Sequence, residues 1–191
     1  RMKLKPILAL ILILFSCGED LPIPKPPTYL RLDLPEHSYR SVESCQFSYQ
    51  LAKEYMNGNE NLGVNGDCSF ELDLGRLNGK LYVFYYPLKA NDTLSKFINF
   101  ANDKVDDHKL KATAINDEKI LRPNDRVFGT FFELQGDVAT NYQFYLTDSV
   151  SHFIRAELLL NARPNYDSLR PSLDYLKKDL MVMVKSLKWK K

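Results

Sequence analysis

Alternating apolar and polar positions through the middle of the chain predict a series of β-strands. Such period-two segments, rich in β-branched and aromatic residues, are typical of strands with one buried face. The predicted strands cover residues 29–34, 47–49, 70–74, 81–86, 127–134, 142–147 and 153–160, with a further extended piece at 112–115. Turn residues at 77–80 and at Asp148-Ser149 join the flanking strands into antiparallel hairpins. The stretch from Asn57 to Gly66, rich in Asn and Gly, is predicted to be a loop.

Apolar residues at spacings of three and four predict two helices. The first follows the candidate caps at 91–93 and has the stripe Leu94, Phe97, Ile98, Ala101 and Val105. The second is predicted to carry Pro171 in its first turn and has the stripe Leu173, Leu176, Leu180, Val184 and Leu187. These elements indicate an α+β domain in which an antiparallel β-sheet is covered by helices, with a C-terminal amphipathic helix.

The first sixteen residues resemble an export signal. Basic residues precede an apolar run from Ile7 to Phe15, which is about half the length needed to cross a bilayer. The run ends at Leu14-Phe15-Ser16-Cys17, which fits the lipobox of bacterial lipoproteins apart from the bulky Phe15. We therefore expect residues 1–16 to be a lipoprotein signal peptide and Cys17 to be the lipidation site. The alternative is an ordinary secretory signal followed by an incidental cysteine.

The expected linker spans residues 17–28. It has four prolines in six positions from Pro22 to Pro27, which favours a stiff, extended spacer between the lipid and the domain. A proline-rich ligand for another protein is the alternative interpretation. Residues 29–191 are expected to form a single α+β globular domain, because this length can bury a hydrophobic core.

The charge of the chain changes when the signal is removed. Three of the 26 basic residues lie in the signal, so 23 basic residues remain against 24 acidic ones, a net charge of −1. A nearly neutral protein with no long Lys or Arg run has little attraction for nucleic acid. We expect no nucleic-acid partner, no cofactor and no small-molecule substrate.

Two cysteines remain once Cys17 is set aside. Cys45 and Cys68 flank the predicted Asn/Gly-rich loop, and disulfides persist in exported proteins. We expect a bridge between them that adds roughly 3 kcal/mol to stability in the chain-entropy model. Two free buried thiols are the alternative, and a metal site is disfavoured because partners at the usual spacing are lacking.

Residues for catalysis are not grouped in this sequence. His37, His108 and His152 are scattered, and neither a Gly-x-Ser-x-Gly elbow nor a Walker-type loop is present. The run Asp106-Asp107-His108 is interpreted as a solvated helix end, and His152 as part of a solvent-facing row. We predict no catalytic residue and no metal ligand. An aromatic docking patch would form if Tyr82, Tyr85, Tyr86 and Tyr142 faced outward.

Three short Asp-Ser/Thr-aliphatic patterns resemble the O-glycosylation acceptor of exported Bacteroidetes proteins. They make Thr93, Ser149 and Ser168 candidate O-glycosylation sites. All three fall at predicted turns or caps, where Asp, Ser and Thr are also favoured for local hydrogen bonding.

Several segments, in order and spacing, resemble one family, the gliding motility lipoproteins GldD of Bacteroidetes. These segments are residues 26–32, the pair Cys45 and Cys68, and residues 109–112, 145–149, 152–155 and 161–169. The resemblance covers nearly the whole mature chain. It implies a non-enzymatic component of the gliding machinery linked to type IX protein secretion, whose partners are other gliding and secretion lipoproteins. An envelope enzyme acting on peptidoglycan or glycan is the alternative function.

The segment from Asn161 to Leu169 is the candidate surface for partner contact, with Arg163, Asn165 and Tyr166 as the candidate contact residues. In the alternative interpretation this segment is structural: Pro164 and Pro171 stiffen it, Asp167 or Ser168 caps the last helix, and Arg163 pairs locally. We expect the lipid to hold the protein in the cell envelope, at the outer membrane and facing the periplasm.

Overall fold

The computed structural model describes residues 33–60, 68–90 and 93–190, and its strands form two antiparallel sheets. The large sheet has seven strands in the order β3-β4-β5-β9-β8-β7-β6, and the small sheet has the order β1-β2-β10. The strands are β1 (Tyr39–Glu43), β2 (Phe47–Ala52), β3 (Met56–Glu60), β4 (Phe70–Asp73), β5 (Gly79–Pro87), β6 (Ala112–Arg122), β7 (Val127–Gly136), β8 (Tyr142–Thr147), β9 (His152–Leu160) and β10 (Lys188–Trp189). The helices are α2 (Leu94–Asp106) and α3 (Tyr166–Ser186), with 3-10 turns η2 (Gly75–Leu77) and η3 (Pro123–Asp125).

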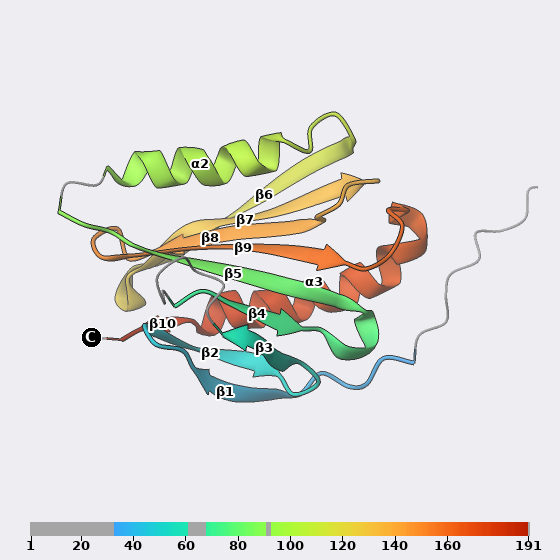
Figure 1. The fold of residues 1–191 in the computed structure, drawn as a ribbon, viewed down its shortest axis with the longest axis horizontal. Helices are drawn as coiled ribbons and strands as arrows, with labels where there is room; N and C mark the ends of the chain where they lie inside the picture. Colours follow the sequence, from blue (N-terminus) through green and yellow to red (C-terminus); the bar gives the residue numbers. More distant parts are fainter. Residues whose placement is uncertain (1–32, 61–67, 91–92, 191) are drawn as a thin grey trace, which may run out of the picture.

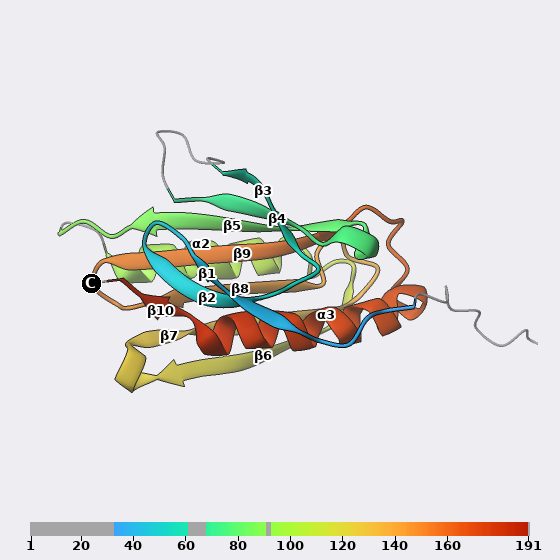
Figure 2. The ribbon, with the colours of Figure 1, turned by 90° about the horizontal axis from the view of Figure 1, so that it is seen from below.

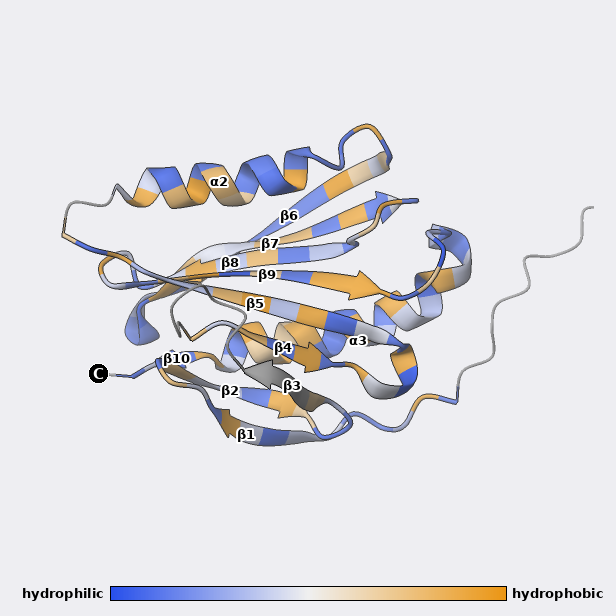
Figure 3. Cartoon of the chain, viewed as in Figure 1, coloured by the Kyte–Doolittle hydropathy of each residue, from blue (hydrophilic) through white to orange (hydrophobic). Residues whose placement is uncertain are grey.

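The large sheet lies between two unequal layers. Figure 1 shows α2 on one of its faces and α3, with the small sheet, on the other. The main core fills the α3 side, where buried Phe47, Leu72, Leu81 and Val184 pack together. The α2 side has smaller clusters around Ala101, Tyr145 and Phe153 and around Val105 and Leu134. Figure 3 shows hydrophobic residues along the central strands and mixed residues along both helices, as expected for helices with one buried face.

The predicted α+β fold is confirmed. The hairpin predicted from residues 70–86 is formed by β4 and β5, with Phe70 opposite Val83. The last two predicted strands are β8 and β9, which pair antiparallel with Phe144 opposite Ala156. The apolar stripe of the first predicted helix faces the sheet, where Ala101 and Val105 are buried. Period-two and helical spacing therefore identified these elements, including β8, which is buried on both faces.

The first predicted strand is wrong where the structure describes it. Asp33 and Leu34 lie in irregular backbone, and the first strand, β1, begins at Tyr39. Residues 29–32 of that prediction lie outside the described residues. The predicted loop from Asn57 also needs correction, because β3 runs to Glu60 and pairs with β4. The rest of that loop, residues 61–67, is outside the described residues.

Two further elements differ from the prediction in extent. The short extended piece at 112–115 is the start of β6, which has 11 residues and pairs along β7. The last helix begins at Tyr166, so Pro171 lies in its second turn instead of its first. Pro171 has no N–H for the Asp167 carbonyl, but both residues are exposed, so water can solvate that carbonyl.

Candidate functional site

The loop between β9 and α3, residues 161–165, is exposed and fixed at both ends. At its start the Asn161 N–H donates to the Asn78 carbonyl at 2.8 Å. At its end Asn165 is the N-cap of α3, and its side-chain oxygen accepts from the Ser168 N–H at 3.2 Å. The Tyr166 N–H donates to Asp137 Oδ1 at 2.9 Å. The loop is therefore held in one shape on the surface, which lowers the entropy lost when a partner binds.

A pocket of about 240 Å³ lies beside this loop. Most of its lining is apolar, and the lining residues are Val138, Ala139, Asn141, Leu159, Leu160, Ala162, Pro164 and Leu169. They come from the β7–β8 connection, the end of β9, the loop itself and the first turn of α3. A concave apolar surface with a few polar groups at its edge is typical of binding sites.

The three residues predicted for partner contact have different environments. Arg163 is exposed, lies between the pocket-lining Ala162 and Pro164, and has no hydrogen bond or ion pair with the described chain. Asn165 is exposed, but its side chain is used in the cap. Tyr166 is half-buried against the main core, and burial raises the pKa of its hydroxyl. Arg163 is thus the side chain of the three that is most available to a partner.

The structural alternative for this segment is wrong in two details. Asn165, not Asp167 or Ser168, caps α3. Arg163 makes no local pair with any described residue. Asn at the N-cap is favoured because its side chain satisfies an otherwise free N–H of the first turn.

The candidate glycosylation residues also differ in exposure. Thr93 is exposed and lies directly before α2. Ser149 is exposed in the β8–β9 turn, where its φ is +68°. Ser168 is half-buried within the first turn of α3. Access for a sugar transferase is therefore better at Thr93 and Ser149 than at Ser168.

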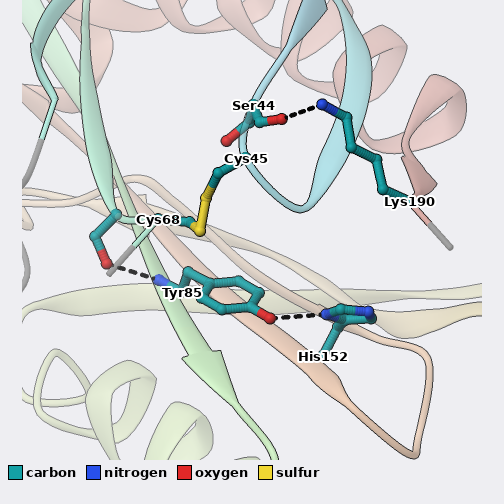
Figure 4. The surroundings of a disulfide bond; sticks show 7 residues. Ser44, Cys45, Cys68, Tyr85, His152 and Lys190 are labelled. Atoms are coloured by element: carbon teal, nitrogen blue, oxygen red, sulfur yellow. Dashed lines mark hydrogen bonds between the residues drawn. A yellow bond between two sulfur atoms is a disulfide. The ribbon is translucent and has the colours of Figure 1, made fainter. Parts of the chain in front are cut away.

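Cys45 and Cys68 form a disulfide in this structure, with Cα atoms 5.8 Å apart. The bridge joins the β1–β2 turn of the small sheet to the segment before β4 of the large sheet (Figure 4). Near it, the Tyr85 hydroxyl lies 2.8 Å from His152 Nδ1, and the His152 ring stacks on Trp189 at 5.1 Å. The disulfide therefore connects the two sheets near the place where Trp189 of β10 stacks on His152 of β9.

The histidines and tyrosines considered as functional residues are used in the fold. His152 is half-buried between Tyr85 and Trp189, so its expected solvent-facing position is wrong. His108 is half-buried as well, with Nε2 3.1 Å from Thr140 Oγ1. The condition for an aromatic patch of Tyr82, Tyr85, Tyr86 and Tyr142 is not met, because Tyr85 and Tyr142 are buried. The exposed neighbours of His108 pair locally: Asp106 with Lys109 and Asp107 with Lys104.

A buried carboxylate that sequence reasoning missed lies on α3. Asp179 is 4% exposed and accepts from the Tyr55 hydroxyl at 2.5 Å and the Tyr39 hydroxyl at 3.0 Å. His37 Nδ1 lies 2.7 Å from the same carboxylate, and its ring stacks on Tyr175. Burial, and then the hydrogen bond to Asp179, raises the pKa of Tyr39 to about 12. The same causes raise the pKa of Tyr55.

The Asp179 cluster attaches the first described segment to the last helix. Tyrosines with raised pKa values remain protonated donors at neutral pH, so they stabilise the carboxylate rather than act as nucleophiles. The sequence feature that could have revealed this cluster is an acidic residue inside the apolar stripe of α3, three residues after Leu176. Such a residue is buried only when other groups satisfy it.

Within residues 33–60, 68–90 and 93–190, no three His, Cys, Asp or Glu side chains are grouped to hold a metal ion. Neither helix described there is long and apolar enough to span a membrane. Cys17 and the expected signal and linker lie outside the described residues.

Comparisons with known proteins identify a family. Curated proteins gave no match. Among solved structures, the solution structure of cyanobacterial PsbP (CyanoP) from Synechocystis sp. PCC 6803 covers 84% of this chain and 98% of its own, at 11% identity and a TM-score of 0.44. The family model described as gliding motility lipoprotein GldD matches residues 19–189.

Proposed function

The chain belongs to the gliding motility lipoprotein GldD family, and we propose that it works by docking to other lipoproteins of the gliding machinery. Family membership makes it a gliding motility lipoprotein that is lipid-anchored in the cell envelope. The proposal adds that Cys17 carries the lipid, that the anchor is in the outer membrane with the domain facing the periplasm, and that the partners belong to gliding and type IX secretion. Docking would stabilise those partners.

The observation that carries this proposal is the exposed Arg163 beside an apolar pocket. Its guanidinium has five N–H donors in a fixed fork and no described partner, so it is free to bind a carboxylate. The pocket of about 240 Å³ next to it can receive an apolar side chain. A partner that fits both carries an aliphatic or aromatic residue close to an Asp or Glu.

The position of the tether supports a membrane-bound partner. The described chain begins at Asp33, and Figures 1 and 2 place this start at the end of the long axis where α3 begins and β9 ends. The β9–α3 loop therefore lies at the end of the domain from which the lipid-bearing segment departs. A second protein held to the same membrane would meet this loop first.

The test compares Arg163→Ala with Lys178→Ala in full-length protein produced in cells. Lys178 is an exposed cation on α3 with no hydrogen bond or ion pair to the described chain, which makes it a matched control. Truncation of an interface arginine costs about 2 kcal/mol, so affinity for the partner lipoprotein should fall roughly thirtyfold. Ala162→Glu, at the pocket, should weaken binding in the same way. Co-purification, gliding and melting temperature would be measured together.

Docking predicts that Arg163→Ala and Ala162→Glu keep the melting temperature but lose the partner and gliding, whereas Lys178→Ala keeps all three. If Arg163→Ala retains its partner and supports gliding, the proposed site is wrong. If His108→Ala or His152→Ala stops gliding while fold and partners stay intact, the enzyme alternative gains support over docking.

A further inference from the structure

The strand β6 forms a free edge of the large sheet. It pairs with β7 on one side and is the last strand in the sheet order. Figure 2 shows it along the border of the molecule, on the far side of β7 from the other strands. An edge strand of 11 residues offers a long row of main-chain groups for pairing with another chain.

The hydrogen bonds of β7 identify the free groups on β6. The Leu134 N–H donates to Asn141 on the β8 side, so the alternate residues Glu133 and Phe131 direct their main-chain groups to β6. Their partners on β6 are Asn116 and Glu118. The intervening residues of β6 therefore direct N–H and C=O groups outward: Ile115, Asp117, Lys119 and Leu121. No turn or loop of the described chain hydrogen-bonds to these groups.

The side chains of these four residues read apolar, acidic, basic, apolar along one face. This order is self-complementary when two copies pair antiparallel around Glu118. Asp117 then lies opposite Lys119 of the second copy, and Ile115 lies opposite Leu121 of the second copy, each pair occurring twice. Opposite charges and apolar side chains directly across two strands are the pairs that stabilise an antiparallel sheet.

Within the single chain Ile115 packs partly against the cluster of Val105 and Leu134, but the rest of this pattern is exposed. Leu121 is 73% exposed, although it is a large apolar side chain. Asp117 and Lys119 form an ion pair with each other at 3.2 Å on the same strand, and both are mostly exposed. A second copy would cover Leu121 and give both charges a partner across the interface.

We propose that β6 pairs with β6 of a second copy of this chain, joining the two large sheets into one continuous antiparallel sheet. The register is centred on Glu118, so the two Glu118 carboxylates face each other on the opposite face of the sheet. This single like-charge pair weakens the dimer. Anchoring both copies to one membrane raises their effective concentration and compensates for a modest interface.

The register is tested by cysteine cross-linking of the full-length protein in membranes. Glu118→Cys places two thiols directly opposite each other, within the Cα separation that a disulfide needs. Mild oxidation should give a covalent dimer on a non-reducing gel. Thr113→Cys is the control: it is exposed on the same strand, but the register puts the two copies of residue 113 ten residues apart, roughly 34 Å.

Charge exchange in the Glu118→Cys protein tests the pairing itself. Asp117→Lys alone, or Lys119→Asp alone, creates two like-charge pairs and should lower the cross-linked fraction at least about tenfold. The double exchange Asp117→Lys with Lys119→Asp restores opposite charges and should restore cross-linking. Light scattering of the detergent-solubilised natural sequence should give the mass of a dimer, and Glu118→Gln should strengthen it.

Three results would overturn the proposal: equal cross-linking at residues 113 and 118, no rescue by the double exchange, or a monomer mass together with no Glu118→Cys dimer. A monomer mass with no dimer would mean that the charges of β6 protect the edge from pairing. None of these variants changes Arg163 or its pocket, so the dimer and the docking proposal can fail separately.

Discussion

Removing the Asp179 carboxylate should loosen the N-terminal segment from α3. In Asp179→Ala, the hydroxyl groups of Tyr55 and Tyr39 and the ring nitrogen of His37 lose their shared acceptor. Tyr55 is 3% exposed, so its hydroxyl cannot turn to water. Tyr39 and His37 are half-buried and can recover part of their hydrogen bonding from solvent.

The magnitude follows from these exposures. A hydrogen bond to a charged group contributes about 1.5–3 kcal/mol, and a buried donor left without an acceptor costs its full desolvation. If the Tyr55 hydrogen bond is counted fully and those of Tyr39 and His37 in part, the free energy of unfolding falls by about 3–4 kcal/mol. For a domain of this size, 1 kcal/mol shifts the melting temperature by about 2–4 °C, so Tm should fall by roughly 10 °C. Asp179→Asn keeps one side-chain oxygen as an acceptor, so its melting temperature should fall by about half as much.

Circular dichroism melts at neutral pH would compare Asp179→Ala with Asp174→Ala, an exposed carboxylate on the same helix with no hydrogen bond to the described chain. The control should stay within about 2 °C of the natural protein. If both variants melt together, or if Asp179→Asn is as stable as the natural protein, the carboxylate does not hold the segment and this reasoning is refuted.

Three other changes have expected outcomes. Cys17→Ala should leave the protein unprocessed or soluble; fractionation that finds it processed and retained in membranes after a high-salt wash would contradict lipidation at this residue. Replacing Cys45 and Cys68 by Ser should cost roughly 3 kcal/mol in denaturant unfolding, and non-reduced mass spectrometry of envelope protein should find the linked peptides, whereas two free thiols would reject the bridge. The pKa values of Tyr39 and Tyr55 in the folded protein lie above the unfolded value of about 10, so their contribution to the free energy of unfolding is complete below about pH 10 and is lost as pH rises towards 12. Denaturant unfolding followed by tryptophan fluorescence should therefore need less denaturant over that pH window in the natural protein. The change should be smaller in Asp179→Ala.

The sequence predicted the elements whose apolar residues follow a strand or helix period, including β8, which is buried on both faces. The strands β8 and β9 and the stripe of α2 were recognisable because apolar residues repeat at the period of the element. The strand β6 was recognised only at its start, because residues 116–119 are exposed on an edge and have no apolar alternation. The strand β1 has one buried residue, Val42, and so gave no pattern either.

The site was less predictable than the fold. The family resemblance made the segment around Arg163 a candidate, but it did not show that Asn165 would be used as a cap or that a pocket would form from the β7–β8 connection, the end of β9, the loop and α3. The Asp179 cluster joins residues 124 to 142 positions apart: Tyr55, Tyr39 and His37 with Asp179. Contacts at that separation depend on the tertiary fold, which local propensity does not determine.

Photo-cross-linking in living cells tests the docking account most directly. A photoreactive amino acid would replace Arg163 in one strain and Lys178 in another, and cross-linked products would be identified by mass spectrometry, including their acylated N-terminal peptides. The account predicts that residue 163, and not residue 178, forms an adduct with a second lipid-anchored envelope protein. No adduct at residue 163, or the same adducts at both positions, would contradict it.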